Sequence, residues 1–458
     1  MHKLLISAAL LAVSSAAAAQ TTRTASAPPA AAGAASVAAA SVSEQRLRQD
    51  VETLVSFGTR HTLSEQDNPR RGIGAAWTWG ENEFRKISQE CGNCLEVVLP
   101  ETTVSGDRIP EPVRLIDVVA IQRGTERPNE VVIVQGHIDS RASDVMDAVS
   151  DAPGANDDAS GTALAVEAAR VLSKNTYPST IVYALLTGEE QGLYGGKLLA
   201  NYAKQQGWTV KAVLNNDIVG GSCGSDGFCD AQNVRVFSEG PRADAGDKDR
   251  AAMRRNGGEN DSPGRNLSRY IAGLAAQEAG ALDVRQIWRT DRMGRGGDQI
   301  PFLEHGFPAV RFTVAVEDYE HQHQDLRVED GVTYGDTIEE MDFPYLANVT
   351  RLNVRALDAL ARAPLPPSPV AEAAVQTFTD IRWDPVPGAA RYNVWRRRTD
   401  QPAWEAEPIA RTDQAALRLE GLRGDDWILG VSSVSAQGAE SPVASAVPGG
   451  GFHPLEKR

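Results

Sequence analysis

The sequence has no long apolar run and no excess of basic residues. Residues 4–13 form an apolar stretch that is too short for a membrane-spanning helix, which needs about 20 residues, and no later stretch reaches that length. Lys and Arg number 46 against 61 Asp and Glu, so the net charge is −15. Such a chain repels phosphates at long range. We therefore expect neither a membrane span nor a nucleic-acid partner.

Cysteine and histidine are both scarce, at four and seven residues. The cysteines form two close pairs in sequence, Cys91 with Cys94 and Cys223 with Cys229. Residues 1–19 have a basic start, an apolar run and an Ala-rich end, which predicts a cleaved signal peptide and a secreted or periplasmic protein. Export favours two local disulfides over a redox C-x-x-C motif or a structural four-cysteine zinc site.

Composition divides the rest of the 458-residue chain into five parts. Residues 20–43 are almost all small or turn-forming, which is typical of a disordered tether. Residues 44–363 alternate apolar and amphipathic stretches and form the expected catalytic domain. Residues 364–369 predict a stiff Pro-rich linker, residues 370–448 a small β domain, and residues 449–458 a loose tail.

The larger part has the pattern of an α/β domain. Its expected strands are residues 115–121, 131–135, 180–186, 211–214 and 309–314, and its expected helices are residues 161–172, 195–206 and 266–279. Strands that are separated by helices predict a mostly parallel central sheet with helices on both faces.

The C-terminal part has short β-type runs that are broken by turn signals. The expected strands are residues 377–383, 392–397, 416–419, 427–434 and 443–447, which predicts a small all-β sandwich. The segment from Trp383 to Trp395 resembles the B–C strand signature of fibronectin type III domains. We expect this domain to aid contact with a surface or polymer, although it can instead simply cap the catalytic domain.

Acidic side chains and a histidine follow three of the expected strands. His137 and Asp139 come after the strand 131–135, Glu189 and Glu190 after 180–186, and Asp217 after 211–214. Because ligands bind beyond the carboxyl ends of strands in an open parallel sheet, these residues are expected at one edge. Between them lies the polar loop 154–161, which contains Asp157 and Asp158.

Carboxylates that converge in this way repel one another unless a cation neutralises them. Imidazole mixed with carboxylate is a ligand set that fits zinc, and two metals require a carboxylate that bridges them. The histidines available as ligands are His61, His137, His305, His321 and His323. Asp158 fits an N-cap position as well as a metal site, because Asp favours helix starts.

Five motifs together resemble the secreted dizinc aminopeptidase and glutamate-carboxypeptidase family. They are His137-Ile138-Asp139, Gly154 to Gly161, Thr187 to Gly192, Asn216-Asp217 and His321 to Asp325, in the family's order and spacing. The resemblance covers roughly residues 51–360. In one segment, residues 296–299, Gln299 stands where the family often has His, which puts a substrate contact from that segment in doubt.

The resemblance implies a role for each matching residue. Asp157 bridges two zinc ions through a loop whose peptide bond to Asp158 is cis. His137 and Asp217 complete one zinc site, and Glu190 and His321 the other. His321 is selected over His323 by the family's spacing to Asp325. Glu189 is the implied general base, and Asp139 orients His137.

We therefore expect a zinc exopeptidase that acts on peptides, most simply an aminopeptidase. A carboxypeptidase is the first alternative, and Arg292, Arg295 and Arg311 are candidate clamps for substrate carboxylates. A glutaminyl-cyclase-like acyl transferase is a second alternative, and it would manage with one zinc. A peptide- or surface-binding protein with a vestigial metal site is the non-enzyme alternative.

Overall fold

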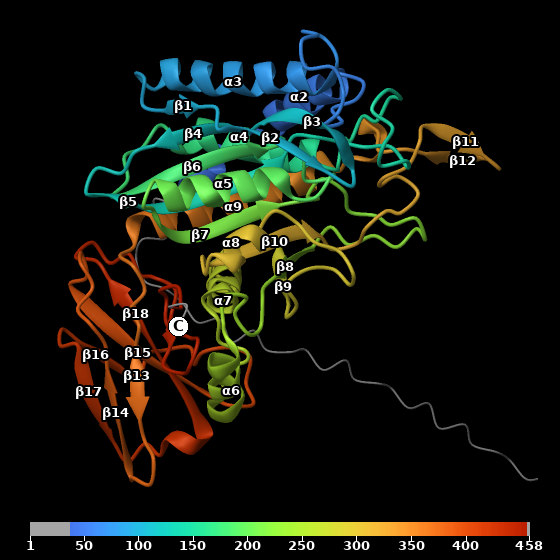
Figure 1. Ribbon diagram of the computed structural model, residues 1–458. Coiled ribbons are helices and arrows are strands. Elements are labelled where there is room, and N and C mark those ends of the chain that lie inside the picture. The colour runs from blue at the N-terminus through green and yellow to red at the C-terminus, as the bar shows by residue number, and fades with distance from the viewer. Residues whose placement is uncertain (1–36, 456–458) are drawn as a thin grey trace, which may run out of the picture.

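A computed structural model describes residues 37–455 of the chain (Figure 1). The expected signal peptide and residues 20–36 lie outside this range. Within it, no helix combines the length and apolar character that crossing a membrane requires.

The larger domain is built around an eight-stranded sheet. The strand order is β1 (Glu96–Val98), β4 (Val118–Gln122), β6 (Ser179–Leu186), β5 (Arg127–His137), β7 (Thr209–Asn216), β10 (Ala309–Val314), β8 (Asn233–Phe237) and β9 (Asp283–Ile287). The central strands β6, β5, β7 and β10 are parallel to one another, while β4 and β8 pair antiparallel with β6 and β10. This mixed but mostly parallel sheet confirms the predicted α/β fold class.

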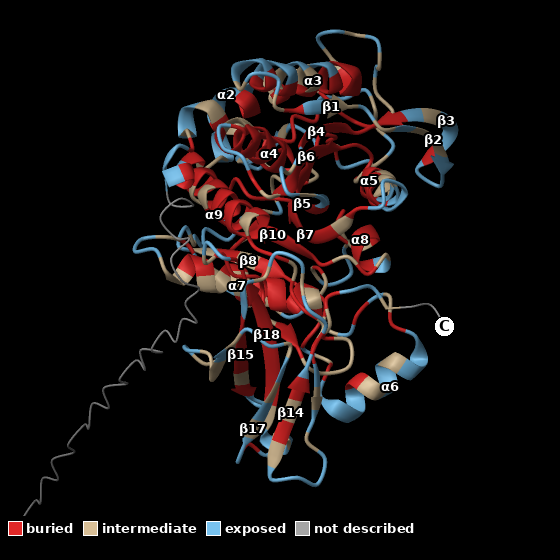
Figure 2. Cartoon of the chain, turned by 90° about the vertical axis from the view of Figure 1, so that its left-hand side faces the viewer, coloured by how far each residue is buried: buried red, intermediate tan, exposed pale blue. Residues whose placement is uncertain are grey.

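Both faces of the sheet are covered by helices, because alternate residues of its strands are apolar on either side (Figure 2). Val132 and Val134 pack into one core cluster, and Val131 and Ile133 into the other. The first face carries α2 (Glu44–Val55), α3 (Gly72–Glu90), α4 (Ala159–Leu172), α7 (Pro263–Ala276) and α9 (Phe343–Arg362). The second face carries α5 (Tyr194–Gln205) and α8 (Ile300–Glu304).

Helix α4 lies unusually close to the sheet at its first turn. A Cβ atom on Gly161 would come within 2.1 Å of the Asn216 carbonyl oxygen, and one on Gly136 within 2.4 Å of the Gly161 backbone. Glycine is therefore required at both positions. The close contact brings the loop before α4 against the ends of β5 and β7.

Several smaller elements lie outside the central sheet. They are the hairpin β2 (Glu101–Gly106) and β3 (Ile109–Ile116), helix α6 (Asp247–Asn256), the short pair β11 (Arg327–Glu329) and β12 (Val332–Tyr334), and the 3-10 turn η1 (Ile338–Glu340). Figure 2 shows the β2–β3 hairpin reaching outward from the edge of the domain.

The C-terminal part is all-β, as expected. One sheet contains β13 (Val370–Glu372), β14 (Phe378–Arg382) and β17 (Ala416–Glu420). The other contains β16 (Ala410–Thr412), β15 (Arg391–Arg398), β18 (Trp427–Val434) and β19 (Ala444–Ser445), with the 3-10 turn η2 (Gly424–Asp426) before β18. Every pairing is antiparallel, and Trp383, Tyr392 and Val431 are buried in its core. Its relation to fibronectin type III domains stays a prediction.

The C-terminal domain is fixed to the larger domain by a buried polar contact. Asp261, which is fully buried, accepts from the Arg397 guanidinium at 2.6 Å and from the Ser445 hydroxyl at 2.7 Å. Asn266 of α7 donates to the same hydroxyl at 2.9 Å, and the Tyr270 hydroxyl donates to the Glu440 carbonyl at 3.1 Å.

Two expected loose segments are ordered over the described residues. Ala38, Ala39 and Val42 are buried in the main core cluster, so the part of the expected tether from residue 37 to 43 belongs to the folded domain. In the expected tail, Phe452 is buried, and Arg242 donates to the carbonyl oxygens of Gly451 and His453. Alanines of the first segment and Phe452 of the second pack against apolar surface of the folded protein, which composition alone does not reveal.

Candidate metal centre

The register of the central strands brings three chain segments to one edge of the sheet. His137, the last residue of β5, pairs with Leu186 at the end of β6, and Gln135 pairs with Asn215 of β7. The segments that follow β6 and β7 therefore leave the sheet beside His137. Glu189, Glu190 and Asp217 lie on these segments, as the sequence predicts.

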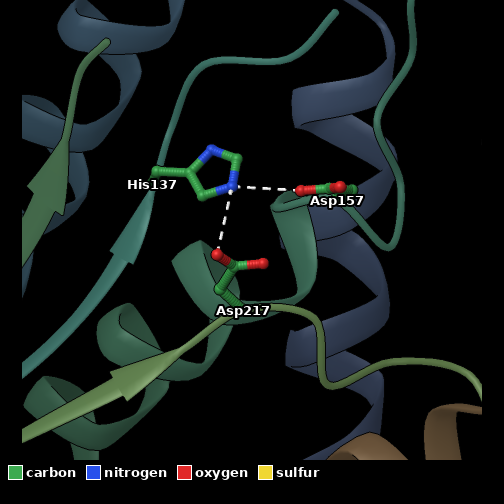
Figure 3. Close-up of side chains that lie close together, drawn as sticks. All are labelled: His137, Asp157 and Asp217. Carbon is green, nitrogen blue, oxygen red and sulfur yellow. Dashed lines mark hydrogen bonds and ion pairs between the residues drawn. The ribbon is translucent and has the colours of Figure 1, made fainter. Parts of the chain in front are cut away.

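His137 faces two carboxylates from different segments (Figure 3). Its Nε2 atom lies 3.0 Å from Asp157 Oδ1 and 3.9 Å from Asp217 Oδ2. All three residues are buried. The three ligand atoms are close enough together to hold one metal ion.

A second group of three lies on the other side of Asp157. The Nε2 atom of His323 lies 2.9 Å from Asp157 Oδ2 and 2.9 Å from Glu190 Oε1. Asp157 thus turns one carboxylate oxygen toward each imidazole. This is the geometry that a bridging carboxylate between two metal ions requires.

The residues of these two groups fit zinc as ligands, and hydrogen bonds between them alone do not satisfy all of their carboxylate oxygens. An imidazole nitrogen carries at most one proton, so His323 Nε2 has two carboxylate oxygens at hydrogen-bond distance for one N–H group. Mixed imidazole and carboxylate ligation is typical of zinc sites. A cation in each group would satisfy the oxygens that one proton cannot.

The electrostatics of the cluster show the same shortage of positive charge. Burial lowers the pKa of His323, but the carboxylates of Glu190 and Asp157 raise it to about 10. Burial acts to raise the pKa of Asp157, yet His323 and His137 hold it well below its ordinary value. Burial, with like charge from Asp217 and Glu190, raises the pKa of Glu189 well above its ordinary value. Of these two carboxylates, Asp157, which adjoins both imidazoles, is thus the one whose pKa is lowered.

The loop that carries Asp157 is held by residues that the sequence analysis did not identify. Asp336 accepts from the backbone N–H groups of Asn156 at 2.8 Å and Asp157 at 2.7 Å. Arg60 is fully buried and donates to the Gly154 carbonyl at 2.9 Å and to the Ile138 carbonyl at 2.7 Å. These partners come from distant segments, so no local pattern marks them.

Asp158 has the N-cap role that the sequence suggested. Its carboxylate accepts from the Gly161 N–H at 3.0 Å at the start of α4, and from the His137 N–H at 2.9 Å. The peptide bond between Asp157 and Asp158 is cis, as the resemblance implied.

Asp139 is fully buried and joins His137 to the turn that carries Glu189 and Glu190. The His137 Nδ1 atom lies 3.1 Å from the Asp139 carbonyl oxygen and 3.5 Å from its carboxylate. The carboxylate accepts from the N–H groups of Gly188 at 3.0 Å, and of Glu189 and Glu190 at 3.3 Å each. Asp139 thus orients His137 mainly through its backbone and fixes the turn through its side chain.

Arg311 holds Asp217 in place from within the protein and does not line the cavity. It is fully buried and donates to Asp217 Oδ1 at 2.6 Å and to Asp291 Oδ2 at 3.2 Å. Gln299, which is also buried, donates to Asp291 Oδ2 at 2.6 Å and so belongs to this support. The expectation that Arg311 can clamp a substrate is wrong, because its donors already face internal acceptors.

His321 does not lie with the other predicted ligands. Its Nδ1 atom is 2.8 Å from Asp318 Oδ2 and its Nε2 atom 3.5 Å from Glu340 Oε1. The structure brings His323 to Asp157 and Glu190 in its place. His323 has a positive φ of 56°, a backbone conformation that is uncommon for residues other than glycine.

The four cysteines, His61 and Ser222 have structural roles. Cys91–Cys94 and Cys223–Cys229 are disulfides, as expected. His61 is buried, and its Nε2 atom lies 2.9 Å from the Val145 carbonyl oxygen. Residues 220–224 read G-x-S-x-G, but the Ser222 hydroxyl donates to Asp342 at the start of α9 at 2.7 Å. That serine therefore serves a helix start.

An open cavity lies over the metal-binding groups. It is lined by Asp157, Glu189, Glu190, Asp217 and His323, by Arg108, Arg141, Arg292 and Arg295, and by Gly192, Leu193, Gly294 and Gly296. Acidic residues thus form one part of the lining and arginines another.

Known proteins that are similar in sequence are zinc metalloproteases. A family model described as Peptidase family M28 matches residues 117–331. A probable zinc metalloprotease of Leptosphaeria maculans is 42% identical over 414 residues, which cover 89% of this chain and 95% of that protein. A probable zinc metalloprotease of Pyricularia oryzae is 42% identical over 422 residues, which cover 89% and 83%.

Solved structures share the fold at lower identity. LapB from Legionella pneumophila is 18% identical with a TM-score of 0.54 and covers 74% of this chain and 78% of its own. The LapA aminopeptidase of Legionella pneumophila is 19% identical with a TM-score of 0.52 and covers 72% and 74%. The fold and site define a zinc metallopeptidase of the α/β class. The chain belongs to Peptidase family M28.

Proposed function

We propose that the chain is a secreted exopeptidase that uses two zinc ions, and that it acts as an aminopeptidase. The observation that carries this proposal is the position of Asp157, whose two carboxylate oxygens face different imidazoles. His137 and Asp217 would hold one zinc ion with Asp157, and Glu190 and His323 the other. His323 thereby replaces His321 in the proposed ligand set.

Bound zinc supplies two things here: it lowers the pKa of a water molecule and polarises the scissile carbonyl. Glu189 is the proposed general base, since it lines the cavity beside the proposed ligand Glu190 without being assigned to a metal. It takes a proton from the attacking water and passes it to the leaving amine. The contacts of Asp139 with the backbone of residues 188–190 hold the turn that carries Glu189.

Aminopeptidase activity is the finer part of the proposal, and its support is indirect. The name of the LapA structure describes an aminopeptidase, and this chain shares its fold. A carboxypeptidase is a second candidate, because four arginines line the cavity and can meet a substrate carboxylate. The complete second group of Asp157, Glu190 and His323 favours a dizinc hydrolase over a one-zinc acyl transferase or a vestigial site.

Secretion is part of the proposal as well. Two disulfides favour an oxidising compartment, and the expected signal peptide agrees with it. The contacts of the C-terminal sandwich with α7 suggest that it caps the catalytic domain, and attachment to a surface or polymer remains a second proposed role.

The two neighbouring histidines provide the test. We expect His323→Ala to lose one of two zinc ions per chain and most peptide hydrolysis, because it removes a ligand from the second group. His321→Ala is the matched control and should keep both ions and its activity. Zinc content by elemental analysis and hydrolysis of aminoacyl and C-terminal fluorogenic peptides, with and without chelator, are the measurements. Equal zinc content in the two variants would refute the ligand assignment.

A further inference from the structure

The cavity over the proposed metal centre is lined by charged residues of both signs. The acidic residues that line it are the four of the proposed catalytic cluster, and the basic residues are Arg108, Arg141, Arg292 and Arg295. Among the lining residues no further carboxylate remains to receive a substrate amine. The arginines are therefore the groups left to recognise the substrate's own charge.

Two of these arginines are already committed to internal partners. Glu317 is buried and accepts from Arg292 at 3.2 Å and from Arg295 at 3.1 Å. Arg292 also donates to Asp291 at 3.2 Å. Arg295 donates to Gln322, whose amide in turn donates to Asp157 Oδ2 at 2.8 Å. This pair is therefore anchored to internal acceptors.

The other two arginines have few internal partners. Arg108 is exposed at the turn of the β2–β3 hairpin, and its one hydrogen bond goes to the Glu190 carbonyl at 2.9 Å. The Nε atom of Arg141 is buried without a hydrogen-bond acceptor and lies 3.5 Å from Glu190 Oε2. A guanidinium group has five N–H donors, so most donors of this pair face the cavity or solvent. Both arginines adjoin Glu190, from different chain segments.

We propose that Arg108 and Arg141 together bind a carboxylate of the substrate, and so select acidic substrates. The inference rests on the proposed peptidase function and names its substrate class. Two guanidinium groups that flank one point can form paired, charge-assisted hydrogen bonds with a single carboxylate. That carboxylate belongs either to an acidic side chain next to the scissile bond or to the free C-terminus of a short peptide.

The test compares substrates that differ by one charge, on the zinc-loaded full chain. The first arm compares Glu and Gln fluorogenic amides, and the second compares Leu-Leu with Leu-Leu amide. In one of the two comparisons, we expect the substrate that carries the carboxylate to have a kcat/KM at least about tenfold higher than that of its neutral partner. Arg108→Gln and Arg141→Gln should each lower kcat/KM for the carboxylate form and so remove most of that preference. Arg423→Gln, on the exposed surface of the C-terminal domain, is the matched control.

Zinc content separates substrate binding from a purely structural role of Arg141. If Arg141→Gln loses zinc, Arg141 serves to position Glu190, and its part of the proposal is overturned. If zinc is retained and the preference is lost, the proposal is supported. Hydrolysis without any preference for the carboxylate forms, or with one that both variants keep, overturns it while leaving the peptidase function intact.

A binding measurement decides the matter even if no peptide is hydrolysed. Absence of all hydrolysis in the zinc-loaded protein would end the proposed function alone. Calorimetry would then compare glutarate with glutaramate, its mono-amide, because the second carboxylate is the only difference. Tighter binding of glutarate by about tenfold, lost in the two variants, supports the arginine site. Equal affinity of the two probes overturns it.

Discussion

Arg311→Met tests how the metal centre is held in place. Arg311 is fully buried, and it donates at 2.6 Å to Asp217 and at 3.2 Å to Asp291, both of them buried. Methionine occupies similar space but removes the cation that adjoins Asp217, and leaves Asp291 with Arg292 as its cationic partner. Removing one partner of a buried ion pair costs about 3–5 kcal/mol in the free energy of unfolding. We expect a loss of that size in protein stripped of metal.

The loss should depend on pH in a defined direction. Burial acts to raise the pKa of Asp291, but Arg311 and Arg292 hold it below its ordinary value. A lowered pKa contributes stability above the unfolded-state pKa of about 4, and this contribution is lost as the pH falls through the folded-state pKa. In Arg311→Met the pKa of Asp291 should rise, so acid relieves the penalty. The difference from wild type should therefore be largest near pH 7–8 and smaller near pH 5.

Urea unfolding of wild type, Arg311→Met and Arg423→Met, in chelator and over this pH range, makes the comparison. Arg423 is exposed, and its variant should stay within about 0.5 kcal/mol of wild type. Added zinc should recover part of the loss in Arg311→Met, because a cation at Asp217 replaces one lost charge. A variant as stable as wild type at pH 7.5 in chelator would refute the reasoning.

Three further predictions concern the base, the loop and the domain contact. Glu189→Gln should keep both zinc ions and lose about 10² to 10⁴ in kcat, whereas Glu190→Ala should lower zinc content; near-normal turnover of the first would remove Glu189 from the mechanism. Asp336→Asn should weaken zinc binding by about 10- to 100-fold in competition with a chelator. The reason is that the backbone N–H of Asp157 loses the carboxylate acceptor that positions this residue. Asp261→Ala should cost about 3–5 kcal/mol in unfolding free energy, since Arg397 is left buried and unpaired; unchanged stability would show that the contact is dispensable.

The sequence alone predicts the fold class and the edge of the sheet that carries the site. Strands such as β6 are mostly apolar and buried along their whole length, and an acidic turn follows closely, so both the strand and the end that carries the site have a local signal. Strands such as β8 and β9 were not predicted, because each is short and mixes polar with apolar residues. The described end of the tether, residues 37–43, and the start of the tail were predicted loose because their packing depends on distant surfaces.

The choice between His321 and His323 shows where a pattern in sequence stops being sufficient. The two residues lie two positions apart, and both have carboxylates in reach once the chain folds. The backbone angles of the segment decide which imidazole meets Asp157, and those angles follow from contacts with other segments: Gln322, for example, is held between Arg295 and Asp157. The same reasoning applies to Arg108 and Arg141, which lie 33 positions apart and meet only at Glu190. The proposed metal ligands that follow strands are thus predictable from order and spacing, whereas the arginines proposed to select a substrate come from loops and need the folded structure.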